Sequence, residues 1–167
     1  MLVLTIQKQK VVEKICKGEY SANYWMSDFA FQSVRFAMGY SMVKEKLSEK
    51  TGSDYLESDT PYWGWVLNPY FDFFKVKSCF GKYSCMFVEV PKEELVFSDY
   101  DLYTDFVLGN SDDCNFFLES IPYGSNKCVQ CSFMNLSKDR VKAVVPLDKL
   151  ESCKGETVED LLKFVSE

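Results

Sequence analysis

The sequence contains no histidine in its 167 residues. A Ser-His-Asp triad, a Cys-His pair, a histidine-ligated metal and a histidine proton shuttle are therefore excluded. Arginine is scarce as well, because only Arg35 and Arg140 occur. A phosphate-bearing ligand would have to rely on lysines, on backbone amides or on one of these two guanidinium groups. Arg35 lies next to the predicted buried stripe of a helix and is the better candidate for ligand binding, the alternative being a solvated helix flank.

Basic residues are fewer than acidic ones, and long apolar runs are absent from the sequence. The formal net charge is -6, which argues against high-affinity nucleic-acid binding because that requires a basic face. No apolar stretch reaches the roughly 18 residues of a membrane helix, and the N-terminal run is too short for a signal sequence. The seven cysteines have irregular spacing and are typical of reduced thiols. We therefore expect a cytoplasmic protein without a membrane segment.

Aromatic residues, in contrast, are abundant, with 14 Phe, 10 Tyr and 3 Trp. The length predicts a single domain over residues 1–167, with a C-terminal helical tail at 146–167. Strand patterns interleaved with few helices predict an α+β fold. We expect a mixed, mainly antiparallel sheet and a pair of helices near the N-terminus.

Apolar periodicity and turn residues predict the individual elements. The predicted helices are Gln9–Lys17, Ser27–Lys50, Tyr100–Leu108 and Val158–Val165. The predicted strands are Leu2–Ile6, Tyr62–Leu67, Ser84–Val90, Lys127–Asn135 and Val141–Val145. Residues 110–126 are predicted to be irregular or a short helix.

Details of these helices can be predicted from single residues. Gly18 is expected to end the first helix in a left-handed conformation, and Ser27 or Asp28 to cap the second. The buried stripe of the second helix is predicted at Phe31, Val34, Met38, Met42 or Val43, and Leu47. In the third helix, Leu102, Phe106 and Val107 are expected to face inward.

Two pairs of residues at alternate positions predict a ligand pocket. Thr5 and Gln7 share one face of the first strand, and Trp63 and Trp65 share one face of a later strand. The indole rings would floor a pocket for a planar ligand such as a nucleobase or a nicotinamide ring, with Thr5 and Gln7 lining it. The alternatives are core packing for the two tryptophans and a half-buried edge strand for the polar pair.

An acidic cluster follows an apolar run at residues 98–101. Ser98 or Asp99 would cap the next helix by accepting from its first amides. Alternatively, Asp99 would bind a ligand and Asp101 would act in catalysis. The two carboxylates could also bind a divalent ion, although no third ligand is indicated. A metal-dependent nuclease built on Asp99, Asp101 and Glu89 is a further interpretation, although Glu89 lies ten residues away on a strand and no Lys is placed in the nuclease pattern.

Cys128 and Cys131 form a lone CxxC pair. On a strand, residues three apart point to opposite faces and cannot chelate one ion. The pair therefore indicates packing, and no metal site is predicted.

Four segments resemble, in order and approximate spacing, an uncharacterised bacterial family, domain of unknown function 3841. They are LVLTIQ (2–7), WGW (63–65), FVEVPKEELVFSDYDLY (87–103) and QCSFMNLSKDRVKAV (130–144). The resemblance covers residues 2 to about 146, and its Ser-Asp-aromatic-Asp-Leu element is fairly specific. The chain has Leu4 and Tyr103 where that family tends to have Trp. Membership of that family would not imply a particular activity.

A more distant resemblance is to compact ADP-ribosyltransferases, such as the toxins that modify DNA bases. The similarity lies in a polar first strand, a helix ending in Gly, and a late strand with Gln followed by a turn and Val-x-x-Val. In those enzymes an Arg or His on the first strand grips NAD, and a Glu on the late strand orients the ribose. The corresponding positions here are Thr5 or Gln7, and Gln130 or Ser132. A neutral Gln can bond a ribose hydroxyl but cannot act as a general base.

Two functions follow from these features. The first is a nucleotide-binding cleft like that of the ADP-ribosyltransferases, with NAD as the implied cofactor and catalysis left open. Its candidate catalytic residues are Gln130 and Asp101, and its candidate ligand-binding residues are Thr5, Gln7, Arg35, Trp63, Trp65 and Asp99. The second is a non-catalytic interaction module, such as a phage-borne or regulatory inhibitor, whose acidic and aromatic surface docks on a basic protein partner.

Overall fold

The structure is a computed structural model that describes residues 1–20, 22–23, 33–67, 83–122, 128–146, 149, 160 and 163. Its strands are β1 (Leu2–Lys8), β2 (Tyr62–Val66), β3 (Tyr83–Glu89), β4 (Val96–Asp99), β5 (Phe117–Leu118), β6 (Val129–Phe133) and β7 (Val141–Pro146). Its helices are α1 (Gln9–Lys17), α2 (Val34–Thr51) and α4 (Tyr100–Leu108), with short 3-10 turns η2 (Lys92–Glu94) and η3 (Lys138–Arg140).

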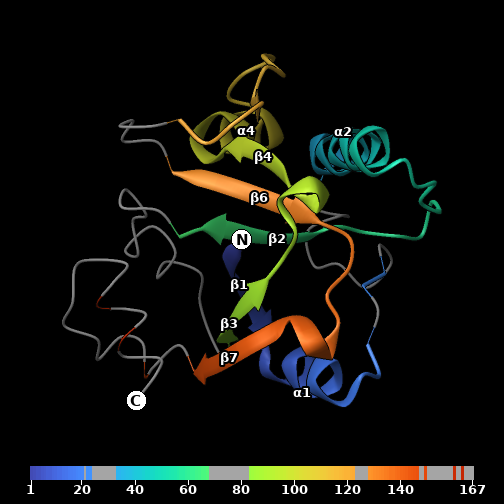
Figure 1. Ribbon diagram of the computed structural model, residues 1–167. Coiled ribbons are helices and arrows are strands. Elements are labelled where there is room, and N and C mark those ends of the chain that lie inside the picture. The colour runs from blue at the N-terminus through green and yellow to red at the C-terminus, as the bar shows by residue number, and fades with distance from the viewer. Residues whose placement is uncertain are drawn as a thin grey trace.

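These strands form one sheet in the order β5-β4-β6-β2-β1-β3-β7 (Figure 1). Each neighbouring pair is antiparallel. The predicted α+β class and the pair of helices near the N-terminus are therefore confirmed. The parallel component of the predicted mixed sheet does not occur among the strands described.

The sheet divides between two of its inner strands, β1 and β2. β1 pairs with β3 over its full length, from Leu2 to Lys8, but it pairs with β2 only through Val3 and Leu4. Beyond Leu4 the hydroxyl of Thr5 donates to the carbonyl of Trp63 at 2.6 Å, so a side-chain bond links the strands where the backbone pairing has stopped. In Figure 1 the two halves visibly diverge, because β2 and β6 run across the view while β3 runs more steeply.

Gly64 lets the two halves meet closely before they part. A Cβ at this position would lie 2.5 Å from a Val3 methyl carbon and 2.8 Å from the Leu4 carbonyl oxygen. Both distances are shorter than real Cβ contacts, so only glycine fits between the two tryptophans of β2.

Helices cover the two faces of the sheet (Figure 1). α1 packs through Val12 and Ile15 on the face that carries Val3, Met86 and Phe133, which we call the α1 face. α2 and α4 lie side by side on the other face, which we call the α2/α4 face. Their contact is close at Gly39, where a Cβ would lie 2.8 Å from the Tyr103 hydroxyl oxygen.

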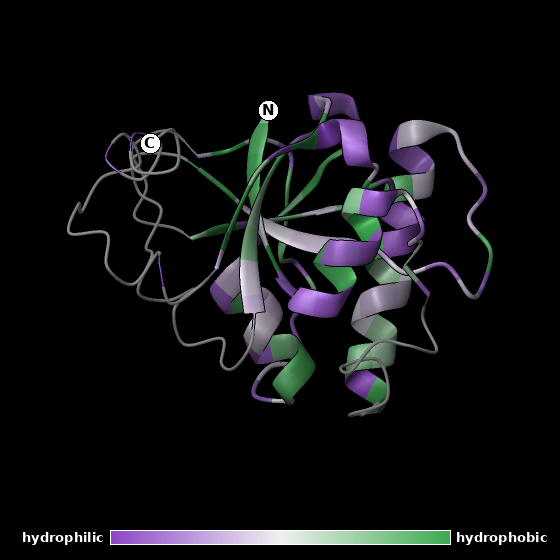
Figure 2. Cartoon of the chain, turned by 90° about the horizontal axis from the view of Figure 1, so that it is seen from below, coloured by the Kyte–Doolittle hydropathy of each residue, from purple (hydrophilic) through white to green (hydrophobic). Residues whose placement is uncertain are grey.

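Hydropathy follows this layering. The strands are largely hydrophobic, whereas the helices carry hydrophilic residues along much of their outer surface (Figure 2). No helix in the described ranges combines the length and the apolarity needed to cross a bilayer.

Most predicted elements are confirmed, and α1 and α4 have the predicted bounds. Gly18 ends α1 with φ 75°, as predicted. α2 begins later than predicted, because Ser33 caps it by accepting from the amide of Phe36. The alternative caps, Ser27 and Asp28, lie outside the described residues. The tail helix at 158–165 does so as well, apart from positions 160 and 163.

The predicted buried stripes were partly wrong. Val34 and Met38 are 77% and 49% exposed, while Val43 and Leu47 are buried. Phe31, the first predicted position of the stripe, lies outside the described residues. The stripe of α2 is rotated because Gly39, rather than Met38, faces α4.

α4 and the segment after it also differ from the prediction. Leu102 is 39% exposed and Tyr103 takes the inward position, while Phe106 and Val107 are buried as predicted. Segment 110–126 contributes the short strand β5, whose Leu118 pairs with Phe97 of β4.

We expect Gly64→Ala to lower the free energy of unfolding by about 1–3 kcal/mol, because the added methyl overlaps Val3 and the Leu4 carbonyl. Urea unfolding followed by circular dichroism measures the change. Ser53→Ala, at an exposed loop position, is the control and should stay within about 0.5 kcal/mol of the original protein. A Gly64→Ala protein as stable as this control would contradict the close approach of β1 and β2.

Candidate functional site

A cleft of about 740 Å³ lies where β1 and β2 separate. Its walls include the ends of both strands beyond their paired positions, together with residues of α1, α2, α4 and β6. The aromatic side chains among the described lining residues are Tyr20, Phe36, Tyr40, Tyr62, Trp63, Trp65, Tyr83, Tyr100 and Tyr103. Such a volume and such an aromatic lining are typical of small-molecule sites.

The two tryptophans of β2 each pack against tyrosines from the helices. The Trp63 ring centroid lies 4.9 Å from that of Tyr103 and 5.4 Å from that of Tyr40. The Trp65 centroid lies 6.3 Å from that of Tyr100. Tyr100 and Tyr103 are three residues apart on α4 and therefore share one helix face. The cleft wall is thus a continuous aromatic surface held by β2, α2 and α4.

Unpaired polar atoms are concentrated in this cleft. Seven buried side-chain nitrogen or oxygen atoms in the described part of the chain have no hydrogen-bond partner, and five of them belong to cleft residues. The five are Thr60 Oγ1, Trp63 Nε1, Trp65 Nε1, Tyr103 Oη and Gln130 Oε1. A buried polar atom left unpaired costs about 1–3 kcal/mol, and most such atoms in proteins are bonded. Their gathering in one cleft gives that cleft free hydrogen-bonding capacity towards a ligand.

These atoms offer a defined set of hydrogen bonds. The indole nitrogens of Trp63 and Trp65 can only donate, whereas the Gln130 carbonyl oxygen can only accept. Gln130 is the direct cross-strand partner of Trp65, so a donor and an acceptor stand next to each other. Burial raises the pKa of the Tyr103 hydroxyl, with a smaller contribution from Tyr40. Tyr103 is therefore neutral at physiological pH and can both donate and accept.

The described residues that line the cleft carry a charge opposite to that of the whole chain. Three lysines line it, Lys8, Lys10 and Lys14, and no Asp or Glu occurs among its described lining residues. The chain as a whole has a net charge of -6. The cleft is therefore suited to an anionic ligand that has an aromatic part.

Four of the eight predicted site residues meet at this cleft. Gln7, Trp63, Trp65 and Gln130 all line it, although they are far apart in the sequence. Their placement agrees with the predicted pocket, and their role in binding stays a prediction.

Thr5 and Asp99 are placed behind the cleft, in structural roles. Thr5 is fully buried. Its hydroxyl accepts a hydrogen bond from the side-chain amide nitrogen of Gln7 at 2.9 Å and donates one to the backbone carbonyl of Trp63. It therefore positions Gln7. Asp99 accepts from the amides of Asp101 and Leu102 at 3.2 and 3.3 Å, which confirms that it caps α4. Neither residue is among the lining residues.

Arg35 and Asp101 lie outside the cleft. The guanidinium of Arg35 is paired with Asp112, donates to the Ser111 carbonyl and lies 5.5 Å from the Phe106 ring centroid. It therefore holds the segment after α4. Asp101 is exposed in the first turn of α4, where a carboxylate interacts favourably with the helix dipole. Neither residue is among those that line the cleft.

The CxxC pair is divided between the two faces, as predicted. Cys128 packs with Leu4 and Trp65 on the α2/α4 face, and Cys131 packs with Val3 on the α1 face. Burial raises the pKa of the Cys131 thiol. The two sulfurs cannot share one metal ion.

Several residues that line the cleft were not predicted as site residues from the sequence. Tyr103 and Tyr40 were missed because helical position alone does not tell which aromatic side chain faces a cavity. The spacing of Tyr100 and Tyr103 was an available signal, since residues three apart share a helix face. Lys10 and Lys14 were missed because exposed lysines are common.

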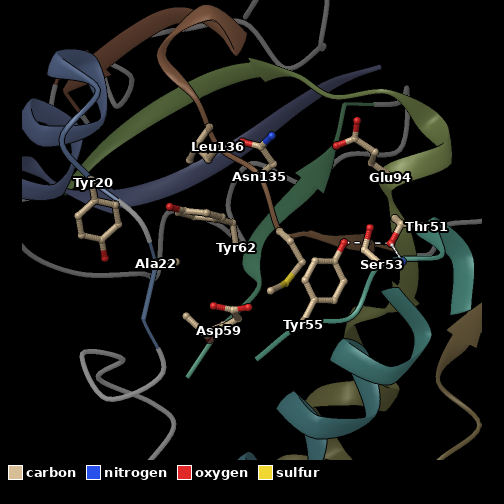
Figure 3. Close-up of a pocket in the computed structure, with 12 residues that line it drawn as sticks. Tyr20, Ala22, Thr51, Ser53, Tyr55, Asp59, Tyr62, Glu94, Asn135 and Leu136 are labelled. Carbon is tan, nitrogen blue, oxygen red and sulfur yellow. Dashed lines mark hydrogen bonds between the residues drawn. The ribbon is translucent and has the colours of Figure 1, made fainter. Parts of the chain in front are cut away.

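A second hollow, of about 560 Å³, adjoins the cleft. The two share Tyr20, Ala22, Thr60 and Tyr62. In Figure 3 the side chains of Tyr20, Tyr62 and Tyr55 surround Asp59. Polar groups are therefore numerous in this hollow too.

Most of these groups are already bonded inside the protein. The hydroxyls of Thr51 and Tyr55 bond each other at 3.0 Å. The carboxylate of Asp59 accepts a backbone amide at 2.7 Å. Glu94 receives two bonds from the guanidinium of Arg140, at 2.7 and 2.9 Å. The second hollow therefore has less to offer a ligand than the cleft.

Comparisons of the chain with models of protein families, with curated proteins and with solved structures found no match. The two family resemblances therefore stay predictions. The use of the cleft has to be argued from its own residues.

We expect Asp99→Ala to lower the free energy of unfolding by about 0.5–2 kcal/mol, because the first amides of α4 lose their cap. Asp99→Asn should retain most of the stability. Asp101→Ala should cost less than Asp99→Ala, because Asp101 does not cap the first amides of α4, and the loss of its interaction with the helix dipole is worth about 0.3–1 kcal/mol. Chemical denaturation compares the three variants, and a larger loss for Asp101→Ala would contradict the assigned roles.

Proposed function

We propose that the chain binds a nucleotide-like ligand in the cleft between β1 and β2, with NAD and ADP-ribose as the first candidates. The observation that carries the proposal is the set of five unpaired buried polar atoms inside an aromatic wall. The choice of NAD and ADP-ribose comes from the resemblance to ADP-ribosyltransferases.

A nucleotide carries the hydrogen-bonding groups that the unpaired polar atoms of the cleft need, and a flat ring that can stack on its tryptophans. A flat heteroaromatic ring would stack on the rings of Trp63 or Trp65, and such stacking is worth about 1–3 kcal/mol per base. Ring nitrogens or a carboxamide oxygen would accept from the indole N–H groups. An amine or a ribose hydroxyl would donate to the Gln130 carbonyl oxygen. Each bond would remove the cost of one unpaired atom.

We propose that the chain binds the ligand, and we do not propose that it transfers ADP-ribose. Gln130 occupies the late-strand position at which the resemblance expects Glu, and a neutral amide cannot serve as a general base. Asp101, the other candidate catalytic residue, is exposed on α4 and does not line the cleft. Gln130 is therefore assigned to hydrogen bonding with the ligand.

NAD or ADP-ribose should raise the melting temperature of the protein. At a hundredfold excess over the dissociation constant, the stabilisation should be about 2.7 kcal/mol. Differential scanning fluorimetry measures it, with glucose as a polar control that lacks an aromatic ring. If neither compound shifts the transition nor binds in calorimetry, the proposal fails and the protein-interaction alternative gains support.

Tyr103→Phe should separate stability from binding. The variant removes an unpaired buried hydroxyl, so the unliganded protein should be as stable as the original or more stable. Affinity for ADP-ribose should fall about fivefold or more, because one ligand hydrogen bond is lost.

Tyr55→Phe is the matched control. Its hydroxyl bonds Thr51 in the second hollow, outside the cleft. This variant should lose a little stability and keep the affinity for ADP-ribose. A Tyr103→Phe protein with unchanged affinity would remove Tyr103 from the binding site.

A further inference from the structure

We infer that the phosphate groups of the ligand bind at the N-terminus of α1, beside Lys10 and Lys14. The inference rests on the proposed nucleotide binding and adds which part of the cleft receives the charge. Three observations support it. Both arginines are bonded to other groups outside the cleft, the start of α1 has no side-chain cap, and lysines line the cleft.

Both arginines are engaged elsewhere. Arg35 is paired with Asp112 at the end of α4, and Arg140 forms two hydrogen bonds with Glu94. Neither lines the cleft. Since a phosphate needs cationic or amide donors, lysines and backbone amides are the groups left to supply them.

α1 begins at the cleft without a cap. The chain passes directly from the end of β1 at Lys8 into α1 at Gln9, four residues beyond the last β1–β2 pair at Leu4, and Lys8 and Lys10 line the cleft there. Lys8, at the N-cap position, makes no side-chain cap hydrogen bond, and the first turn has no acidic residue. The first amides of a helix carry a partial positive charge and favour anions. A phosphate in the cleft would complete this helix end.

The lysines increase the same preference. Lys10 and Lys14 are four residues apart on α1 and line the cleft together, so both amino groups can reach one ligand. Neither forms an ion pair with another group in the described ranges. Lys10 stands in the first turn, where the helix dipole disfavours a cation. An anion bound there would relieve that repulsion.

The same cleft also contains unpaired polar groups that point to a ligand independently of the helix. Trp65 and Gln130 are each only 7% exposed, and each has a polar atom without a partner. The ligand therefore combines an uncharged heteroaromatic part at β2 and β6 with an anionic part at α1. A nucleoside diphosphate has this division.

The test compares three probes by isothermal titration calorimetry: ADP-ribose, adenosine and inorganic pyrophosphate. Each is titrated into the original protein and into the double variant Lys10→Gln/Lys14→Gln. The control is Lys17→Gln/Lys46→Gln, which removes the same charge at exposed positions outside the cleft. Circular dichroism confirms that each variant is folded.

We expect the Lys10→Gln/Lys14→Gln protein to lose affinity for ADP-ribose by about tenfold or more and to lose pyrophosphate binding. Adenosine affinity should be unchanged, and the control should bind all three probes as the original does. Equal affinity of ADP-ribose in the original and the Lys10→Gln/Lys14→Gln protein, with adenosine bound as well as ADP-ribose, would overturn the phosphate site and leave nucleotide binding intact.

Pyrophosphate separates the two claims. If it binds and adenosine does not, the phosphate site is supported and the aromatic part of the proposed function fails. If none of the three probes binds the original protein, both claims are overturned.

Discussion

The fold depends on the way β1 and β2 meet and then part. Gly64 lets the two strands touch at Val3 and Leu4, and the hydroxyl of Thr5 holds the Trp63 carbonyl where the backbone pairing has ended. A fully paired sheet would have closed this gap with ladder hydrogen bonds. The division instead leaves a cleft, places the start of α1 at one side of it, and turns two indole rings towards the tyrosines of α2 and α4.

The residues around this cleft are unfavourable for the protein alone. Indole nitrogens, hydroxyls and one amide carbonyl oxygen are buried there without partners, and a lysine stands in the first turn of a helix where an acid would be more stable. Elsewhere in the described chain such departures are fewer, with only Ser98 and Ser132 holding unpaired buried hydroxyls. Asp99 caps α4, Arg140 is paired with Glu94, and left-handed glycines end the three described helices. Departures from local rules that gather at one place are typical of functional sites.

The sequence predicted more of the fold than of the site. The α1 helix was found because Gly18 marks its end, and the tryptophan strand was found because its aromatic residues alternate around a glycine. Sequence could not predict that Thr5 and Trp63 lie on opposite faces, because the division of the sheet depends on tertiary pairing. For the same reason the alternate positions of Thr5 and Gln7 suggested one shared pocket wall, whereas Thr5 lies behind it and only Gln7 reaches the cleft.

The most direct test of the binding site is the indole N–H region of a ¹H–¹⁵N spectrum during titration with ADP-ribose. The chain has 3 Trp, and Trp63→Phe and Trp65→Phe variants assign the two signals that matter. Hydrogen bonding of both unpaired indole groups to the ligand would move these two signals together, with saturation at a common dissociation constant. If ADP-ribose at millimolar concentration leaves both signals in place, the cleft is not its binding site.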